Sequence, residues 1–481
     1  MSDLAITRDR YCAKWCIAFL ACLLLFPSSC NDRIPDSPPN LLLITMDTVR
    51  ADHLSCYGYA RKTSPIIDRL ASQGVRFEDA YCEVPITAPS HATMLTGLHP
   101  SRHGVRTNGL YVLNPGRRTL AEILEEKGYQ TAAFLGAIPL DHRFGLNQGF
   151  QVYDDDFSSS ELSGKAKQDW YGIKVINGER RASEVVKRAL SWLRHRDENP
   201  FFLWVHLFDP HSPYAPPPPF TRKFYPADPA ASAIDSLKPV KDLGHPWHEW
   251  LEPYRDLRYP IALYDGEIAY ADNQVGKLLE GLEESGEDQR TVICLVADHG
   301  ESLTEHNYYF FHGDLLYEPS LRIPWLMVYP SNLDAGLTVK GRVQLADLMP
   351  TVLDLLGVEL PAGLDGTSLV PAIKGAQINE NRPILHEALL RDGSGKGVRA
   401  IRSGDFKLIA YPDGKIELFN IAQDPVETFN IAKENNDLAM KLHAELKDLE
   451  SKLEAPGQEQ QREGILDPQA LEALRSLGYT Q

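Results

Sequence analysis

The chain of 481 residues has a formal net charge of −17, and 43% of its residues are hydrophobic. This negative charge disfavours nucleic acid and other polyanions as partners, and the length allows a large core with one small additional domain. If such a protein binds an anionic ester, it needs a local centre of positive charge, such as a metal ion.

Residues 1–30 have the pattern of a secretory signal peptide. Basic residues precede an apolar stretch from Trp15 to Phe26, which is too short to span a bilayer. Cys30 follows small residues, as in a bacterial lipoprotein signal. Lipid attachment to its sulfur is one interpretation, and ordinary cleavage nearby is the other. Residues 31–39 then form a polar tether. The pattern predicts export to a bacterial periplasm or cell envelope, with a lipid anchor at Cys30 as a candidate membrane attachment.

Three unbroken apolar segments are each followed by an aspartate. They are residues 40–46 before Asp47, residues 201–208 before Asp209, and residues 291–297 before Asp298. Such segments are typical of strands buried on both faces, as in a parallel sheet between helices. Ligands bind at the carboxyl ends of such strands, so we expect the aspartates to meet at one edge. The alternative is that each aspartate caps a helix or a turn.

The segments between these strands have helix signals. Residues 64–74 begin with Ser64 as a cap and a proline in the first turn, and residues 120–127 and 264–284 have apolar stripes at helical spacing. Residues 213–260 are rich in proline and aromatic residues and form either a substrate wall or surface packing.

The chain after residue 380 predicts a smaller unit. Short strands are expected around residues 407–409 and 416–419, followed by a charged helix at 435–453 and a short docking helix within 464–481. We therefore predict a larger α/β domain at residues 40–375 and a small C-terminal α+β subdomain with terminal helices at residues 376–481.

Thr87 stands between a proline-containing turn and a predicted helix that begins near Ser90. A lone threonine in this position is usually an N-cap. Its hydroxyl is also a candidate nucleophile, because the helix would direct backbone N–H groups towards a bound oxyanion. Asn108 is a candidate donor of a further hydrogen bond to that oxyanion. His91, one turn into the helix, either orients the nucleophile or caps the helix.

A threonine alcohol needs a cation to stabilise its alkoxide. The candidate ligands are Asp47, Asp298 and His299, together with the oxygen of Thr87. Mixed carboxylate and imidazole ligands favour Zn²⁺ or Mn²⁺, with Ca²⁺ or Mg²⁺ as alternatives.

Several motifs in this order resemble the sulfatase branch of the alkaline phosphatase superfamily. They are residues 47–58, Thr87-Ala-Pro-Ser-His91, His103-Gly104, Asp209-Pro-His211 and Asp298-His-Gly-Glu301. The resemblance runs from about Asn40 to the end of the chain. It implies the central, mostly parallel sheet of that superfamily, with a small C-terminal subdomain, and a metal-dependent ester hydrolase.

The departures from the family's pattern point towards phosphoesterases. Formylglycine sulfatases carry Cys or Ser where this chain has Thr87, and oxidation of a threonine would stop at a ketone. His91 replaces the arginine of their signature, and residue 48 is Thr instead of a second acidic ligand. Their sulfate-binding Gly-Lys-Trp-His segment is missing around residues 135–145. Thr87, His91 and Asn108 are instead similar to nucleotide pyrophosphatase/phosphodiesterases, which use an unmodified threonine.

The resemblance also implies a second candidate metal site, formed by Asp209, His211 and His312. Two-metal phosphatases of the superfamily use one Asp and two His there, but Asp209 and His211 are only two positions apart. His211 is therefore either a metal ligand or the acid that protonates the leaving group, and His312 has similar alternatives. His206 and His306 are weaker candidates, and we expect His206 to be a core histidine.

We predict a metal-dependent hydrolase, with one or two ions, that cleaves phosphate mono- or diesters through a covalent Thr87 intermediate. Its substrate is a small anionic ester, and an envelope glycan or lipid is a candidate source of that ester. Within enzymes, the alternatives are a sulfuric ester hydrolase and a transferase of phosphoethanolamine or phosphoglycerol groups. Outside enzymes, the alternative is a binding protein that keeps the fold. No pattern supports a Cys56–Cys82 disulfide, although an oxidising compartment would permit it.

Overall fold

The computed structural model describes residues 38–157, 179–244, 246–379, 382–389 and 396–453. The predicted signal peptide with Cys30, most of the tether and the predicted docking helix within 464–481 lie outside the described residues. By their contacts, the described residues from Pro39 onwards form one compact unit, and the domain boundary predicted at residue 375 stays a prediction. Of the helices that the structure describes, none is long and apolar enough to cross a membrane.

An eight-stranded sheet in the order β4-β3-β5-β1-β6-β7-β2-β8 forms the centre of the fold. Its strands are β1 (Asn40–Met46), β2 (Val75–Tyr81), β3 (Gln130–Phe134), β4 (Val152–Asp154), β5 (Phe201–Leu207), β6 (Thr291–Ala297), β7 (Arg322–Val328) and β8 (Leu337–Gln344). Strand β7 runs antiparallel to β6 and β2, and the other neighbouring strands pair in parallel. The predicted mostly parallel sheet is confirmed.

Strands β1, β5 and β6 are the three unbroken apolar segments of the sequence. All three are buried along their whole length. Strand β1 lies between the other two, and Met46 at its end is opposite both Leu207 of β5 and Ala297 of β6. Their carboxyl ends therefore share one edge of the sheet, as predicted.

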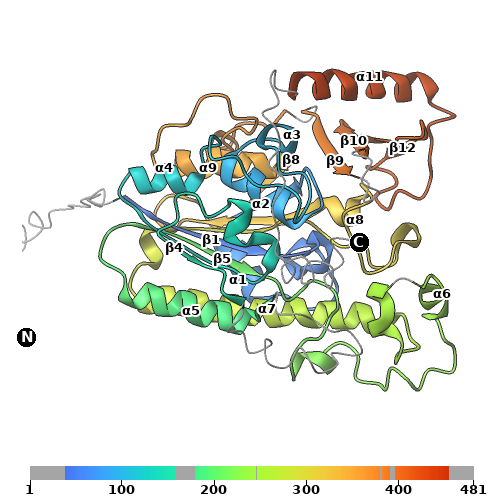
Figure 1. The fold of residues 1–481 in the computed structure, drawn as a ribbon, viewed down its shortest axis with the longest axis horizontal. Helices are drawn as coiled ribbons and strands as arrows, with labels where there is room; N and C mark the ends of the chain where they lie inside the picture. Colours follow the sequence, from blue (N-terminus) through green and yellow to red (C-terminus); the bar gives the residue numbers. More distant parts are fainter. Residues whose placement is uncertain (1–37, 158–178, 245, 380–381, 390–395, 454–481) are drawn as a thin grey trace, which may run out of the picture. The chain divides into compact units, whose positions relative to one another are not determined.

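Helices cover both faces of the sheet (Figure 1). On one face α7 (Arg258–Glu284) packs against α1 (Pro65–Gln73) and α5 (Ala182–His195), and on the other α2 (Thr87–Thr96) packs against α4 (Leu120–Glu126) and α9 (Leu348–Leu355). Helix α7 begins before the predicted Tyr264, because Pro260 falls in its first turn, where no N–H donor is needed. Among the described residues before β9, the structure also has the short α-helices α3 (Pro100–His103), α6 (Lys238–Lys241), α8 (Glu318–Leu321) and α10 (Val370–Ile373).

The N-terminus of α1 is capped from another helix. Ser64 makes no capping hydrogen bond, although it precedes Pro65 as predicted. Instead Oδ1 of Asp272, on α7, accepts hydrogen bonds from the backbone N–H groups of Ile66 and Ile67 at 3.1 and 2.8 Å. The start of α1 therefore depends on a tertiary contact.

A second, antiparallel sheet in the order β12-β11-β10-β9 forms the C-terminal subdomain. It consists of β9 (Ile384–Leu389), β10 (Gly397–Ser403), β11 (Phe406–Ala410) and β12 (Ile416–Asn420), covered by α11 (Asn436–Leu453). This confirms the small C-terminal α+β unit.

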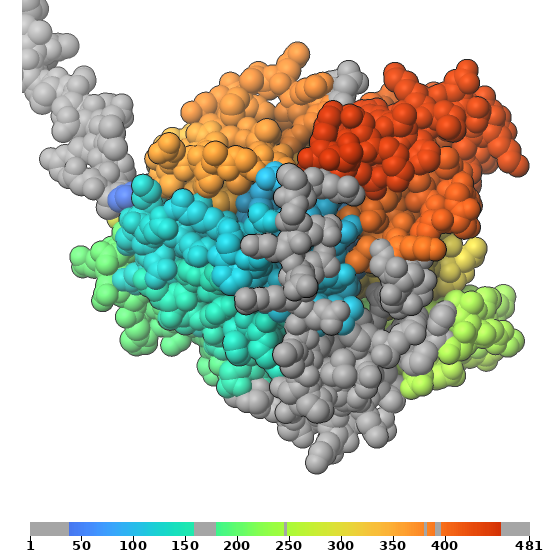
Figure 2. Space-filling model, turned by 45° about the horizontal axis from the view of Figure 1, so that its top comes forward, coloured from blue at the N-terminus to red at the C-terminus, as the bar shows by residue number. Residues whose placement is uncertain are grey.

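Buried polar contacts join the C-terminal subdomain to the rest of the fold. Lys407 of β11 pairs with Glu318 at 3.0 Å, and Arg106 pairs with Glu387 of β9. In the space-filling view the orange-to-red C-terminal atoms lie against the blue and cyan atoms of the first part of the chain (Figure 2).

The cysteines that the structure describes, Cys56, Cys82 and Cys294, are all free, so a Cys56–Cys82 disulfide is not formed. Cys294 is buried in β6, as expected. In the segment 213–260, Trp250 and Tyr254 are buried, and Trp250 packs edge to face against Tyr214. These contacts are the packing that the sequence left as one alternative, while a substrate-wall role for this segment stays a prediction.

Candidate active site

Asp47 and Asp298 lie side by side at the carboxyl edge of the sheet. Each follows directly after one of two neighbouring strands, β1 and β6. Oδ1 of Asp298 accepts hydrogen bonds from the backbone N–H groups of Thr48 and His299 at 3.2 and 2.8 Å. Thr48 adopts a left-handed conformation with φ of 55°, and its carbonyl oxygen accepts a hydrogen bond from the hydroxyl of Tyr264. This turn holds the two aspartates together.

Asp47, Asp298 and His299 form the predicted ligand cluster. One ligand atom from each lies within 4.8 Å of the others, and all three residues are completely buried. Nε2 of His299 is 3.9 Å from Oδ1 of Asp47 and 3.5 Å from Oδ2 of Asp298. These distances leave room for an ion between the side chains.

The charges of this cluster are strongly perturbed. Burial raises the pKa of Asp47 well above its usual range, the charge of Glu301 raises it further, and the side chains of Thr87 and Asp298 lower it. Burial and the charge of Asp47 likewise raise the pKa of Asp298. Burial, followed by His312, lowers the pKa of His299. Both acids therefore resist ionisation unless a positive charge lies beside them.

The donor set of the cluster fits a divalent cation. Both carboxylate oxygens of Asp47, Oδ2 of Asp298 and Nε2 of His299 are buried and make no hydrogen bond of standard geometry. Leaving such atoms without partners is costly, and an ion would satisfy them all. Carboxylate and imidazole ligands are compatible with Zn²⁺ or Mn²⁺, and the identity of the metal stays a prediction.

His206 contacts this cluster, although its place in an apolar strand predicted a core histidine. Its Nε2 lies 3.3 Å from Oδ2 of Asp47, and its side chain is completely buried. His206, His91 and Asp298 form a second group of possible ligands. The pairing of His206 with Thr45 of β1 places it next to Asp47, and that pairing is visible only in the folded sheet.

Thr87 is the first residue of α2, so the prediction of a helix beginning near Ser90 was wrong. The first bond of the helix runs from the N–H of Ser90 to the carbonyl oxygen of Ile86, and Ile86 occupies the N-cap position. Thr87 is therefore not the N-cap that a lone threonine would suggest. Its buried side chain lies beside Asp47, whose pKa it lowers. The candidate nucleophile thus adjoins the candidate metal ligands.

The first turn of α2 offers fewer backbone donors than predicted. The N–H of Ala88 donates to Oδ1 of Asn108 at 2.8 Å, Pro89 has no N–H, and the N–H of Ser90 is used within the helix. Nδ2 of Asn108 is buried and has no hydrogen-bond partner among the described residues. Asn108 is therefore bound to the start of α2 through its Oδ1, and its Nδ2 is left as the donor that its predicted contact with an oxyanion requires.

Glu301 is a residue of this site that sequence reasoning missed. It is completely buried, and its Oε1 lies 3.1 Å from Nδ1 of His312. The His312 ring in turn lies near those of His299 and His211, with centroids 4.3 and 5.1 Å away. The position of Glu301 three residues after Asp298 was the available signal, but its partner became visible only in the fold.

Asp209 does not join His211 and His312 in a ligand group within the described part of the chain. Its Oδ2 accepts a hydrogen bond from the N–H of Ala182 at the start of α5, and its Oδ1 is 3.4 Å from Arg181. This is the helix-capping role that the sequence left as the alternative. The candidate second metal site therefore lacks its carboxylate in this arrangement.

The remaining candidates lie in less suitable surroundings. His306 stacks on Tyr317, with ring centroids 3.5 Å apart. Asp141, His142 and Asp155 form another cluster of possible ligands, but His142 is exposed and Asp141 is bound by Arg143.

Comparisons with known proteins agree with this geometry. The sequence model of the family Sulfatase matches residues 39–358, and that of the family N-sulphoglucosamine sulphohydrolase, C-terminal, matches residues 304–452. The N-acetylglucosamine-6-O-sulfatase of Bacteroides thetaiotaomicron is 26% identical over 86% of this chain and 86% of its own length. Arylsulfatase K of Rattus norvegicus is 28% identical over 85% of this chain and 77% of its own length.

Solved structures share the fold. The phosphonate monoester hydrolase of Agrobacterium radiobacter is similar with a TM-score of 0.70 and 25% identity, over 86% of this chain and 96% of that one. A protein solved in complex with its substrate D-glucosamine-2-N,6-O-disulfate is similar with a TM-score of 0.66 and 23% identity, over 87% of this chain and 98% of that one. The architecture thus occurs in proteins named for both sulfate and phosphonate esters.

Proposed function

Because this chain belongs to the sulfatase family, whose sequence model matches residues 39–358, we propose that it hydrolyses a phosphate mono- or diester with Thr87 as nucleophile. Membership supports the coarser statement that the chain is a hydrolase of sulfuric or phosphoric esters. The observation that carries the finer proposal is the position of Thr87. Its unmodified alcohol lies beside Asp47 at the start of α2, where it cannot supply the formylglycine aldehyde.

The Thr87 hydroxyl gives its proton to solvent water, and its oxygen attacks the phosphorus atom in line with the leaving oxygen, whose bond to phosphorus breaks. A divalent cation held by Asp47, Asp298 and His299, with the Thr87 oxygen as a further ligand, would stabilise the alkoxide and the charge of the ester. Nδ2 of Asn108 donates a hydrogen bond to a non-bridging oxygen of the ester.

A histidine of the site supplies the proton of the leaving alcohol. We assign this role to His211, whose Nδ1 lies 2.6 Å from the carbonyl oxygen of Ser212 and whose ring lies 5.1 Å, centroid to centroid, from that of His312. His312, held by Glu301, orients the neighbouring rings. A water molecule then hydrolyses the threonine ester and restores the hydroxyl.

Sulfuric ester hydrolysis is the second candidate function. The names of the curated relatives favour it, since they include an N-acetylglucosamine-6-O-sulfatase and an arylsulfatase. It would require the Thr87 alcohol itself to attack sulfur. The substrate in either case is a small anionic ester, and a sulfated or phosphorylated envelope glycan is a candidate carrier.

A parallel assay separates the two candidates. Wild type, Thr87→Ala and Thr87→Ser are incubated with aryl phosphate mono- and diesters, an aryl phosphonate ester and an aryl sulfate. We expect phosphoester turnover by wild type, partial retention in Thr87→Ser and a loss of about three orders of magnitude or more in Thr87→Ala. Intact-protein mass spectrometry of an acid-quenched reaction should detect one phosphoryl group on wild type.

Turnover of the sulfate ester alone would overturn the phosphate proposal. Full activity of Thr87→Ala would overturn the nucleophilic role of Thr87. Because Thr87→Ser keeps the alcohol, its behaviour separates the loss of the nucleophile from a general disturbance of α2.

We further propose that the protein is exported and lipid-anchored through Cys30, on the strength of the signal-peptide pattern of residues 1–30. Metabolic labelling with a fatty acid should modify wild type and leave Cys30→Ser unlabelled. Secretion of unlabelled wild type would contradict the anchor.

A further inference from the structure

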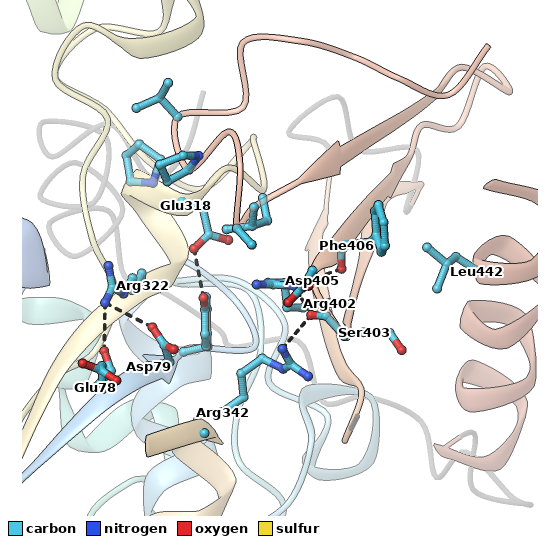
Figure 3. Close-up of a pocket in the computed structure, with 18 of the residues that line it drawn as sticks. Glu78, Asp79, Glu318, Arg322, Arg342, Arg402, Ser403, Asp405, Phe406 and Leu442 are labelled. Atoms are coloured by element: carbon cyan, nitrogen blue, oxygen red, sulfur yellow. Dashed lines mark hydrogen bonds and ion pairs between the residues drawn. The ribbon is translucent and has the colours of Figure 1, made fainter. Parts of the chain in front are cut away.

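A cavity of about 1030 Å³ lies between the central sheet and the C-terminal subdomain. It is lined by residues of β2 and β8 on one side, and by the turn between β10 and β11 and by α11 on the other (Figure 3). Neither Thr87 nor any of Asp47, Asp298 and His299 is among the described residues that line it. The cavity is therefore distinct from the candidate active site.

Two arginines meet in this cavity. Arg342 of β8 and Arg402 of β10 are each only 7% exposed. Nη1 of Arg342 donates to the carbonyl oxygen of Gly404 at 2.6 Å, and Nη1 of Arg402 donates to the same oxygen. Two guanidinium groups from different sheets thus converge on one point, in the turn between β10 and β11 (Figure 3).

Three of the six guanidinium nitrogen atoms of this pair are not used within the described chain. Nε and Nη2 of Arg342 and Nε of Arg402 are buried and have no hydrogen-bond partner among the described residues. Burial, followed by the charge of Arg402, lowers the pKa of Arg342, although Tyr81, Asp79 and Asp405 act in the opposite direction. Two like charges with unsatisfied donors are costly inside a protein unless a counter-charge joins them.

Several of the carboxylates near the pair already bind other cations. Asp79 pairs with Arg322 at 3.1 Å, and Glu318 pairs with Lys407 at 3.0 Å. Arg50, which also lines the cavity, forms ion pairs with Asp52 and Glu305. Asp79 and Glu318 therefore offset only part of the charge of the Arg342–Arg402 pair, because each already pairs with another cation.

We propose that Arg342 and Arg402 bind a tetrahedral oxyanion, a sulfate or phosphate group, in a second site at this seam. The planar guanidinium fork matches such a group and forms charge-assisted hydrogen bonds with it. The lining also contains the carboxylates of Glu78, Asp405 and Glu445, which repel further negative charge and accept hydroxyl groups. The site therefore takes a single oxyanion, either free or carried by a hydroxyl-rich sugar. It does not depend on which ester Thr87 cleaves.

The test is isothermal titration calorimetry of the full chain with sodium sulfate, sodium phosphate, N-acetylglucosamine 6-sulfate and N-acetylglucosamine. Thr87→Ala serves as the background, so that no probe is consumed. We expect two oxyanions to bind each chain, and Arg342→Lys or Arg402→Lys to weaken one of them about tenfold or more. Arg76→Lys, on neighbouring β2 and outside the cavity lining, should leave both affinities unchanged. If this site binds N-acetylglucosamine 6-sulfate more tightly than inorganic sulfate, its ligand is an oxyanion carried by a sugar. If it binds inorganic sulfate more tightly, its ligand is the free anion.

Residues at the exposed rim of the cavity can be changed without removing the hydrogen bonds of Arg342 and Arg402 to the carbonyl oxygen of Gly404. Lys340 and Lys441 are exposed and line the cavity, so Lys340→Glu and Lys441→Glu should fold normally and still weaken the same site several-fold by repulsion. When Thr87 is intact, the variants at Arg342, Arg402, Lys340 and Lys441 should hydrolyse a small aryl ester at the rate of wild type. Any oxyanion binding, at one site or two, that neither the arginine nor the rim variants weaken overturns the proposal, and a single bound oxyanion that they do weaken places the failure at the Thr87 site.

Discussion

Nδ1 of His91 lies 2.8 Å from the carbonyl oxygen of Thr87, one turn earlier in α2. Burial, followed by the charge of His206, lowers the pKa of His91 well below its usual value, so the ring is neutral. A carbonyl oxygen can only accept, so the single ring proton is on Nδ1. Nε2 then accepts from the hydroxyl of Thr45 at 3.1 Å, and that oxygen accepts from Nε1 of Trp204 at 3.0 Å. The chain of bonds connects β5 and β1 to the candidate nucleophile.

We expect His91→Leu to lower kcat about ten- to a hundredfold with a smaller change in KM, because a displaced nucleophile reacts more slowly without losing substrate contacts. His91→Asn should recover part of the activity, since its amide can still donate to the carbonyl oxygen of Thr87. Thr45→Val, which removes only the outer bond, should have a smaller effect. Steady-state kinetics and the melting temperature of each variant provide the measurement. An unchanged kcat in His91→Leu would show that His91 does not position Thr87.

The cluster of Asp47, Asp298 and His299 predicts one tightly bound divalent ion per chain. Removing the ion with a chelator should abolish activity and lower the melting temperature by several degrees, because binding to the folded state alone stabilises it. Asp298→Asn and His299→Ala should lower the metal content measured by elemental analysis. Asp141→Asn, in the partly exposed cluster near His142, is the matched control and should leave the metal content unchanged. Equal metal content in Asp298→Asn and Asp141→Asn would contradict this assignment.

The sequence could predict the role of a site residue only where the signal for that role lies in neighbouring residues of the chain. Asp47, Asp298 and His299 directly follow buried strands, so local hydrophobicity was enough to bring them together. The role of Asp209 depends on where α5 begins in space, and no residue near Asp209 indicates that. His206 has the surroundings of a core histidine until its pairing with β1 is known.

The same limit applies to the fold. The three buried strands followed from hydrophobic patterns, which act within a segment, and the C-terminal α+β unit followed from short apolar segments together with the family resemblance. The cap of α1 could not be predicted in this way, because its acceptor, Asp272, lies on a helix about 200 residues later in the chain. Helix α2 begins at Thr87 instead of near Ser90, and Pro89 lies in its first turn, where a proline is tolerated.

The capping role of Asp272 gives a stability prediction. Asp272→Ala removes the acceptor of two N–H groups and should cost about 1–2 kcal/mol, since capping residues contribute on this scale. Asp272→Asn keeps one acceptor oxygen and should cost less. Ser72→Ala, at an exposed position of α1, is the control and should be near neutral. Thermal unfolding followed by circular dichroism measures the three differences, and equal effects of Asp272→Ala and Ser72→Ala would contradict the cap.

Glu83 links three parts of the fold near the candidate active site. It lies in the segment between β2 and Thr87, and its Oε1 accepts a hydrogen bond from the N–H of Ala346 at 3.0 Å. Its carbonyl oxygen accepts from the N–H of Glu387 in β9 at 2.9 Å. Its second carboxylate oxygen is buried and has no hydrogen-bond partner among the described residues. The Glu83 carboxyl is therefore in surroundings that oppose its ionisation.

Burial is the main cause that raises the pKa of Glu83 to about 8, from an ordinary value of 4.5. The folded chain thus keeps the Glu83 proton over a pH range in which the unfolded chain has lost it. The stability that Glu83 contributes is therefore complete below pH 4.5 and is lost as the pH rises through 8. Glu83→Gln cannot titrate, so its melting temperature relative to wild type should rise between pH 5 and pH 9, by an amount corresponding to a few kcal/mol. Glu434→Gln, at an exposed position, should show no such trend. A difference between wild type and Glu83→Gln that stays constant over this range would mean that Glu83 is ionised in the folded protein, held by Ala346 and the nearby Arg382.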